Sequence, residues 1–102
     1  MALIAEFHPE ARAEFDAAME YYELVRPGLG SAFLAEVQAA TEYAQRLPQA
    51  GAPVSEDLRR TFIRRFPYFL LYATEATRIY ILAVAHCRRR PGYWRSRSGH
   101  RA

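Results

Sequence analysis

Lysine is absent from the 102 residues of the chain, so its fourteen basic side chains are all arginines. Cysteine occurs once, at Cys87, and cannot form an internal disulfide, which makes a reducing cytoplasm the expected compartment. No apolar run approaches the length needed to span a bilayer. The first residues reach a charged side chain within six positions, which is not the pattern of a secretory signal. We therefore expect a cytoplasmic protein without membrane contact.

The composition is typical of a folded domain. Hydrophobic residues make up 51% of the chain and charged residues 25%, which excludes a disordered or low-complexity protein. A chain of this length can bury one modest core without disulfides or metal, so we expect a single domain over residues 1–94. Residues 95–102 are rich in Arg and Ser and have no periodicity, which predicts a disordered basic tail.

Charge is segregated along the chain. Residues 1–50 contain three arginines and eight acidic residues, a balance of −5, whereas residues 51–102 contain eleven arginines and three acidic residues, a balance of +8. Arginine has a planar group that pairs with phosphate or carboxylate. The basic half therefore indicates an anionic partner, either a nucleic acid or an acidic protein segment.

The acidic half has the pattern of a strand followed by two helices. Residues 2–7 predict a short strand, and Pro9 suits the first position of a helix. Apolar residues recur at helical spacing over residues 11–25 and again over residues 33–47. Because the connection between them is short, we expect an antiparallel helical hairpin. Acidic residues of the first helix, Glu14 among them, are expected to face solvent.

The basic half has an extended pattern. After a loop over residues 48–57, strands are predicted over residues 58–66, 68–73 and 78–86. The last run is almost entirely apolar, which is typical of a central strand buried on both faces. The element order is β-α-α-β-β-β, and we expect an α+β fold in which the hairpin covers one face of a small antiparallel sheet.

The residues that follow the central strand are the strongest candidates for a functional surface. They combine cations with aromatic rings at the end of a rigid element: His86, Arg88, Arg89, Arg90, Tyr93 and Trp94. Arginines hold phosphates and rings stack on bases in nucleic-acid sites, and the same residue types anchor protein interfaces. Alternatively, Tyr93 and Trp94 fold back and cap the core. Arg59 and Arg64, on the predicted strand before Pro67, are expected to extend the same surface.

Four segments of the chain resemble one family when they are taken together and in order. They are FHPEARAEFDAAMEYYE, PGLGSAF, RRFPYFLLY and AVAHCRRRPGYW. Over nearly its whole length the sequence resembles the RelE/ParE superfamily, the toxins of bacterial type II toxin–antitoxin modules that are also described as plasmid stabilisation proteins. The resemblance implies the β-α-α-β-β-β fold and, as partner, a cognate antitoxin that neutralises the toxin.

The two branches of this superfamily imply different targets. In a RelE-like, ribosome-dependent mRNA endonuclease, Arg59, Arg88 and Arg89 would clamp the phosphate and His86 or Tyr93 would transfer the proton. In a ParE-like inhibitor of DNA gyrase, the arginines and rings of the C-terminal segment would be contact residues without hydrolytic chemistry. The resemblance to the gyrase branch is the stronger, and we expect a gyrase poison. A fold member that acts only as a binding module is the third possibility.

No metal or cofactor is expected in any of these alternatives. The three histidines lack the spacing of metal ligands, and the glycines near the second helix are not followed by the lysine of a phosphate-binding loop.

Overall fold

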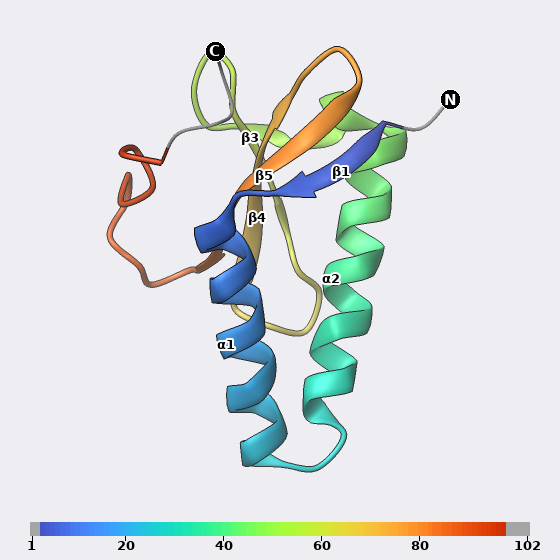
Figure 1. Ribbon diagram of the computed structural model, residues 1–102, viewed down its shortest axis with the longest axis vertical. Helices are drawn as coiled ribbons and strands as arrows, with labels where there is room; N and C mark the ends of the chain where they lie inside the picture. Colours follow the sequence, from blue (N-terminus) through green and yellow to red (C-terminus); the bar gives the residue numbers. More distant parts are fainter. Residues whose placement is uncertain (1–2, 98–102) are drawn as a thin grey trace.

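The computed structural model describes residues 3–97 and has an α+β architecture in which two helices cover one face of a five-stranded sheet (Figure 1). The elements, in chain order, are β1 (Ile4–Phe7), α1 (Pro9–Val25), α2 (Leu29–Arg46), the short 3₁₀ helix η1 (Pro48–Ala50), β2 (Ala52–Pro53), β3 (Arg59–Phe62), β4 (Tyr68–Thr74) and β5 (Arg78–His86). The predicted fold class and the helical hairpin are confirmed. Neither helix is both long and apolar enough to cross a bilayer.

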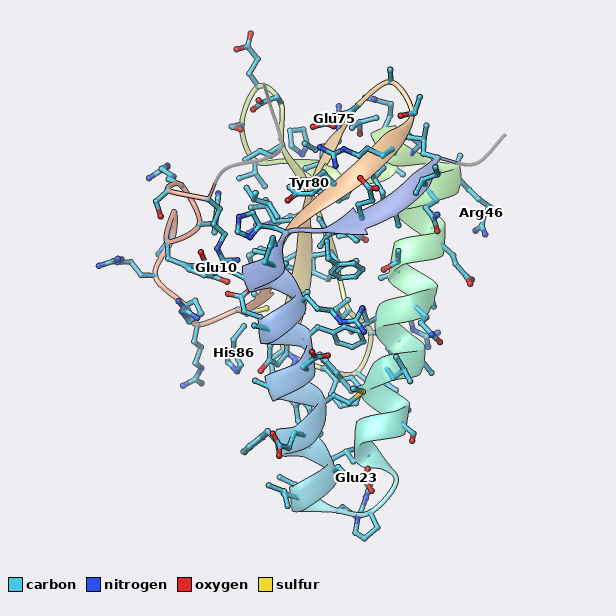
Figure 2. All side chains as sticks on the ribbon, in the orientation of Figure 1. Glu10, Glu23, Arg46, Glu75, Tyr80 and His86 are labelled. Atoms are coloured by element: carbon cyan, nitrogen blue, oxygen red, sulfur yellow. The ribbon has the colours of Figure 1, made fainter. Side chains whose placement is uncertain are left out.

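The helical hairpin is tied together at its turn. Gly28, the N-cap residue before α2, has a φ of 90°, which glycine adopts without strain. The Glu23 carboxylate at the end of α1 accepts hydrogen bonds from the backbone N–H groups of Gly28 and Gly30, at 3.0 to 3.1 Å (Figure 2). A Cβ atom on Gly30 would lie 2.7 Å from the carbonyl oxygen of Met19, so the helices approach closely there because residue 30 has no side chain.

The strand order is β1-β5-β4-β3-β2, which places β5 inside the sheet. The β2–β3, β3–β4 and β4–β5 pairs are antiparallel, but β1 lies parallel to β5, so the sheet is mixed and the expectation of an antiparallel sheet is wrong for β1. A parallel pair requires a long connection between its strands. The two helices, together with β2, β3 and β4, supply that connection here.

The sheet is buried on both faces, as predicted for its central strand. One hydrophobic cluster lies between the sheet and the helices and contains Phe15, Phe33, Leu70, Tyr72, Ile81 and Val84. A second cluster lies on the far face and contains Leu58, Phe69, Leu71, Leu82 and Trp94. The chain after β5 contributes Trp94 to the second cluster, and Tyr93 packs against it.

Three predicted boundaries differ from the structure. The strand expected over residues 58–66 is confined to β3, because the chain turns before β4 and Arg65 has a φ of 72°. The predicted loop contains η1 and β2. The disordered tail expected from Arg95 onward is wrong for residues 95–97, since Arg97 is buried and hydrogen-bonded to the body of the protein. The rest of that predicted tail, residues 98–102, lies outside the described residues.

Candidate functional site

The site begins where β5 ends and the chain reverses. Cys87 donates its backbone N–H to the carbonyl of Pro67 at 2.8 Å, and Arg89 donates its own to the carbonyl of His86 at 3.0 Å. These bonds bend the chain away from the strand direction. The C-terminal segment, residues 87–97, then crosses the far face of the sheet, where the Trp94 ring packs edge-on against Phe69. The reversal leaves the three consecutive arginines on the outside of the turn, all of them exposed.

Glu14 of α1 organises the C-terminal segment. Its Oε1 atom accepts from the backbone N–H of Val84 at 3.0 Å, and both carboxylate oxygens accept from the Arg97 guanidinium, at 3.0 and 2.6 Å. Its Oε2 atom also accepts from the Tyr93 hydroxyl at 2.8 Å. Arg97 donates once more, to the Leu82 carbonyl at 2.9 Å. We call Glu14, Val84, Leu82, Tyr93 and Arg97 the Glu14 network.

The Glu14 network lies along the part of the β5 edge that β1 does not cover. The register pairs the last residue of β1, Phe7, with Ile81. Beyond Ile81 the chain of β1 has turned into α1, so β5 has no further neighbour from β1 there. Buried backbone groups need hydrogen-bond partners. Glu14 and Arg97 provide them for Val84 and Leu82, and this need explains why two charged side chains are buried at this point.

Tyr93 is enclosed by cations. The guanidinium carbons of Arg89 and Arg97 lie 3.8 and 4.9 Å from the centre of its ring. Burial of the hydroxyl, followed by its hydrogen bond to Glu14, raises the pKa of Tyr93 well above that of a free tyrosine. The hydrogen bonds with Glu14 likewise raise the pKa of Arg97. Tyr93 is therefore a neutral hydrogen-bond donor whose proton is already engaged.

His86 lies in a surface pocket beside α1 (Figure 2). This strand-exit pocket has a volume of about 290 Å³ and is lined by Glu14, Ala17, Ala18, Tyr21, Tyr68, Val84, His86 and Arg89. The Nδ1 atom of His86 accepts from the backbone N–H of Arg88 at 3.0 Å. Its ring meets Tyr68 edge-on, with centroids 5.1 Å apart. The pocket thus combines two tyrosine rings, an imidazole and a guanidinium.

The structure brings together only part of the predicted surface. His86, Arg89 and Tyr93 lie around the strand-exit pocket and the Glu14 network, and the exposed Arg88 and Arg90 lie on the adjoining turn. The single continuous surface expected at the strand end is therefore smaller than predicted.

The other three predicted residues lie elsewhere. Trp94 is buried, with 8% of its surface exposed, and caps the far-face cluster, which was the alternative stated for it. Arg59 donates hydrogen bonds to the carbonyls of Gln49 and Gly51. The strand register aligns Arg59 with a position of β5 that lies five residues before His86, which is about 16 Å along the strand at 3.3 Å per residue. Arg64 lines a different groove, beside α2.

Comparison with known proteins identifies the family to which this fold and surface belong. The model of a family described as the ParE toxin of the type II toxin–antitoxin system parDE matches residues 5–91. The chain belongs to the ParE toxin family. It is accordingly the toxin component of a type II toxin–antitoxin module, and its partner is an antitoxin.

A solved structure agrees with this assignment at the level of the fold. The structure is described as a chromosomal ParDE toxin–antitoxin system from P. aeruginosa, and its chain is 17% identical to this toxin with a TM-score of 0.71. The match covers 83% of this chain and 96% of that chain. No curated protein sequence matches the chain significantly.

The two charged members of the Glu14 network, Glu14 and Arg97, were not predicted as site residues of the ParE toxin. Glu14 was expected to face solvent, yet its side chain is 16% exposed. A signal for its burial is present, since Glu14 lies three residues after Ala11 and four before Ala18, both on the buried stripe of α1. No comparable signal marks Arg97, which follows the last strand and whose side chain is held by residues distant in the sequence.

Both predicted proton-transfer groups already take part in hydrogen bonds. A nuclease of the RelE type needs a group that takes a proton and one that supplies it. Tyr93 already donates its proton to Glu14, and the Nδ1 lone pair of His86 accepts from the backbone. Among residues 3–97 no three His, Cys, Asp or Glu side chains are grouped as metal ligands. The exposed arginines and rings are suited to hold an anionic or protein surface.

Proposed function

We propose that this ParE-family toxin stops bacterial growth by poisoning DNA gyrase, with the strand-exit pocket and the adjoining arginine turn as its contact surface. Membership of the ParE family supports this target over the mRNA in the ribosome, because the family resemblance associates ParE-like toxins with gyrase. The observation that carries the proposal is the hydrogen bond from the Tyr93 hydroxyl to Glu14. It engages the tyrosine that a RelE-like mechanism would need as a proton-transfer group.

The contact surface has the chemistry of a protein or DNA interface. Arg88, Arg89 and Arg90 are exposed and adjacent, and Arg89 is additionally supported by the Tyr93 ring at 3.8 Å. Arg89 also lies 3.9 Å from the Glu14 carboxylate, and 53% of its side chain remains exposed to solvent. Such guanidinium groups pair with carboxylates or phosphates, both of which a complex of gyrase with DNA presents.

The decisive experiment measures both candidate activities with the same purified protein. Gyrase, relaxed plasmid and ATP are incubated with the toxin, and linear DNA released on denaturation reports a stabilised cleavage complex. Translating ribosomes with a defined mRNA are incubated in parallel, and truncated transcripts report nuclease activity. We expect linear DNA and intact mRNA. Truncated mRNA with undamaged DNA would refute the proposal, and so would normal growth of a host in which expression is verified.

The Tyr93→Phe variant makes the distinction sharper. It removes the hydroxyl and keeps the ring on which Arg89 lies. In a binding role, we expect gyrase poisoning to change by less than about threefold, because the ring and the arginine remain. Loss of a catalytic proton-transfer group costs roughly 100-fold or more. If the ribosome assay shows mRNA cleavage by the wild type and Tyr93→Phe loses it by that factor at unchanged stability, Tyr93 has a catalytic role and the proposal is contradicted.

A further inference from the structure

Two residues of the strand-exit pocket have hydrogen-bond donors that the described chain leaves free. The Nδ1 atom of His86 accepts from the backbone N–H of Arg88, so Nδ1 carries no proton and the proton of the ring is on Nε2. Among residues 3–97, no acceptor is hydrogen-bonded to this Nε2–H or to the guanidinium of Arg89. Both residues line the pocket, which therefore has a neutral donor and a cationic donor.

The His86 ring is fixed from two sides. His86 is paired with Tyr68 between β5 and β4, and the two rings meet edge-on with their centroids 5.1 Å apart. The hydrogen bond from Arg88 restrains the Nδ1 side of the ring. A donor that is held in place before a ligand arrives loses little conformational entropy on binding. The Nε2–H group is thus preorganised to donate.

The Arg89 side chain is placed by the ring of Tyr93. The central carbon of its guanidinium lies 3.8 Å from the ring centre, while 53% of the side chain is exposed. A guanidinium that lies on an aromatic face still has N–H donors at its own edge. Within residues 3–97 the side chains of Arg88 and Arg90 have no ring or ion-pair contact of this kind. Arg89 is therefore the arginine of the turn that the fold positions.

Glu14 also lines the pocket, but its charge is compensated. The carboxylate accepts two hydrogen bonds from Arg97, one from the Tyr93 hydroxyl and one from the backbone N–H of Val84. Glu14 and Arg97 together carry no net charge. The charge of Arg89 is then a positive surplus in the pocket, and an anion is the ligand that this surplus and the free donors favour.

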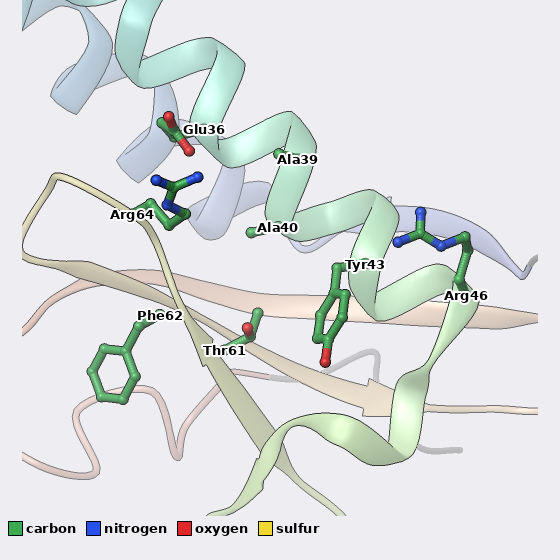
Figure 3. A pocket seen from close by; sticks show the side chains of 8 residues that line it. All are labelled: Glu36, Ala39, Ala40, Tyr43, Arg46, Thr61, Phe62 and Arg64. Carbon is green, nitrogen blue, oxygen red and sulfur yellow. The ribbon is translucent and has the colours of Figure 1, made fainter.

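The groove beside α2 lacks this combination among its lining residues (Figure 3). Arg46 and Arg64 lie at its two ends rather than together, and Glu36 lies opposite Arg64. The acidic side chain reduces the positive charge at that end, and no imidazole lines the groove. Of the two pockets, the strand-exit pocket is the one suited to an anion.

We propose that the strand-exit pocket binds one phosphate of a DNA backbone, held by the Nε2–H group of His86 and the guanidinium of Arg89. Arg88 and Arg90 contact neighbouring phosphates. Three consecutive exposed arginines favour a polyanion with closely spaced charges, as DNA has, over the scattered carboxylates of a protein surface. His86 is here a neutral donor, and no bond to phosphorus is made or broken. The inference deepens the proposed function and rests on it for the presence of DNA in the gyrase complex.

The test measures binding of the purified toxin to a fluorescently labelled short DNA duplex, by anisotropy at a series of salt concentrations. Arg89→Gln removes one charged phosphate contact. We expect the affinity to fall at least about fivefold, and the slope of log affinity against log salt to become shallower by about 0.9. Arg95→Gln is the matched control, since Arg95 is exposed in the same segment and lines a different pocket; its affinity should change less than about twofold.

Two variants of His86 separate its donor from its contact with the turn. His86→Asn retains an acceptor near Nδ1 for the backbone of Arg88 but has no donor near Nε2, and His86→Gln has the donor without the acceptor. We expect the affinity for DNA to fall at least about threefold for His86→Asn and less than about twofold for His86→Gln. The salt slope should not change in either, because a neutral donor releases no counterion. The reverse order would assign His86 a structural role and overturn the proposal.

The remaining outcomes separate this inference from gyrase poisoning. A toxin that poisons gyrase but does not bind the duplex even at low salt would overturn the phosphate site alone, as would DNA binding that Arg89→Gln leaves unchanged. If His86 and Arg89 instead determine the affinity for gyrase without DNA, the pocket binds a carboxylate of that protein and the proposal fails. DNA binding that depends on both residues, without any gyrase poisoning, would refute the proposed function alone.

Discussion

Replacing Glu14 by alanine tests whether the Glu14 network holds the C-terminal segment in place. The side chains of Glu14 and Arg97 are 16% and 6% exposed, so the pair is buried rather than a surface ion pair. Removing one member of a buried pair costs about 3–5 kcal/mol because the other charge stays buried without compensation. Small domains have total unfolding free energies of about 5–15 kcal/mol. Glu14→Ala should therefore lose a large fraction of the stability of the protein.

Urea denaturation measures this loss, and the single buried tryptophan, Trp94, reports it by fluorescence because the same segment holds it against the sheet. Arg12→Ala is the matched control, since Arg12 and Asp16 form an exposed pair worth less than about 1 kcal/mol. A Glu14→Leu and Arg97→Met double variant should be more stable than Glu14→Ala, because no unpaired charge remains buried. A loss below about 1 kcal/mol for Glu14→Ala, or a double variant no more stable than it, would refute the reasoning.

Three further predictions concern the turn, the tyrosine and the helical hairpin. Joint replacement of Arg88 and Arg89 by alanine should weaken growth inhibition at least about tenfold at equal expression, and an unchanged phenotype would remove them from the contact surface. The pKa of Tyr93 is raised in the folded protein, so above about pH 10 only the unfolded chain loses this proton. The unfolding free energy should therefore fall as the pH rises above about 10. Urea denaturation at a series of pH values should show a shallower fall for Tyr93→Phe than for the wild type. Gly30→Ala should lower the unfolding free energy by about 1–3 kcal/mol, since its Cβ atom would meet the Met19 carbonyl at 2.7 Å, and a thermal melt at or above that of the wild type would contradict this.

Local patterns predict the elements of this fold well and their mutual arrangement less well. The apolar period marks both helices, and the continuous apolar run marks β5 as a buried strand, because these signals depend only on neighbours along the chain. The parallel direction of β1 depends on where the intervening elements return the chain. Nothing within residues 2–7 records that return, so the expectation of an antiparallel sheet was wrong there.

The candidate site was predictable in part for the same reason. The exposed arginines and His86 could be located at the end of β5 because the position of the strand end follows from the hydrophobic pattern. Trp94 was uncertain between two roles, since burial of a ring on the far face requires knowing that the chain reverses. Glu14 and Arg97 are separated by 83 residues, and an isolated acidic residue and an isolated arginine give no sign in the sequence that they will pair.

The pairing of β1 with β5 has a consequence for synthesis of the toxin. Translation produces β1 first among the strands and β5 last, and β5 is the strand beside which β1 lies. Until the ribosome has released β5, the first strand has no neighbour, and the helices have no finished surface on which to pack. A product of translation that stops before β5 therefore lacks the sheet on which the toxin fold depends, and the cell meets a folded toxin only after this last strand has been made.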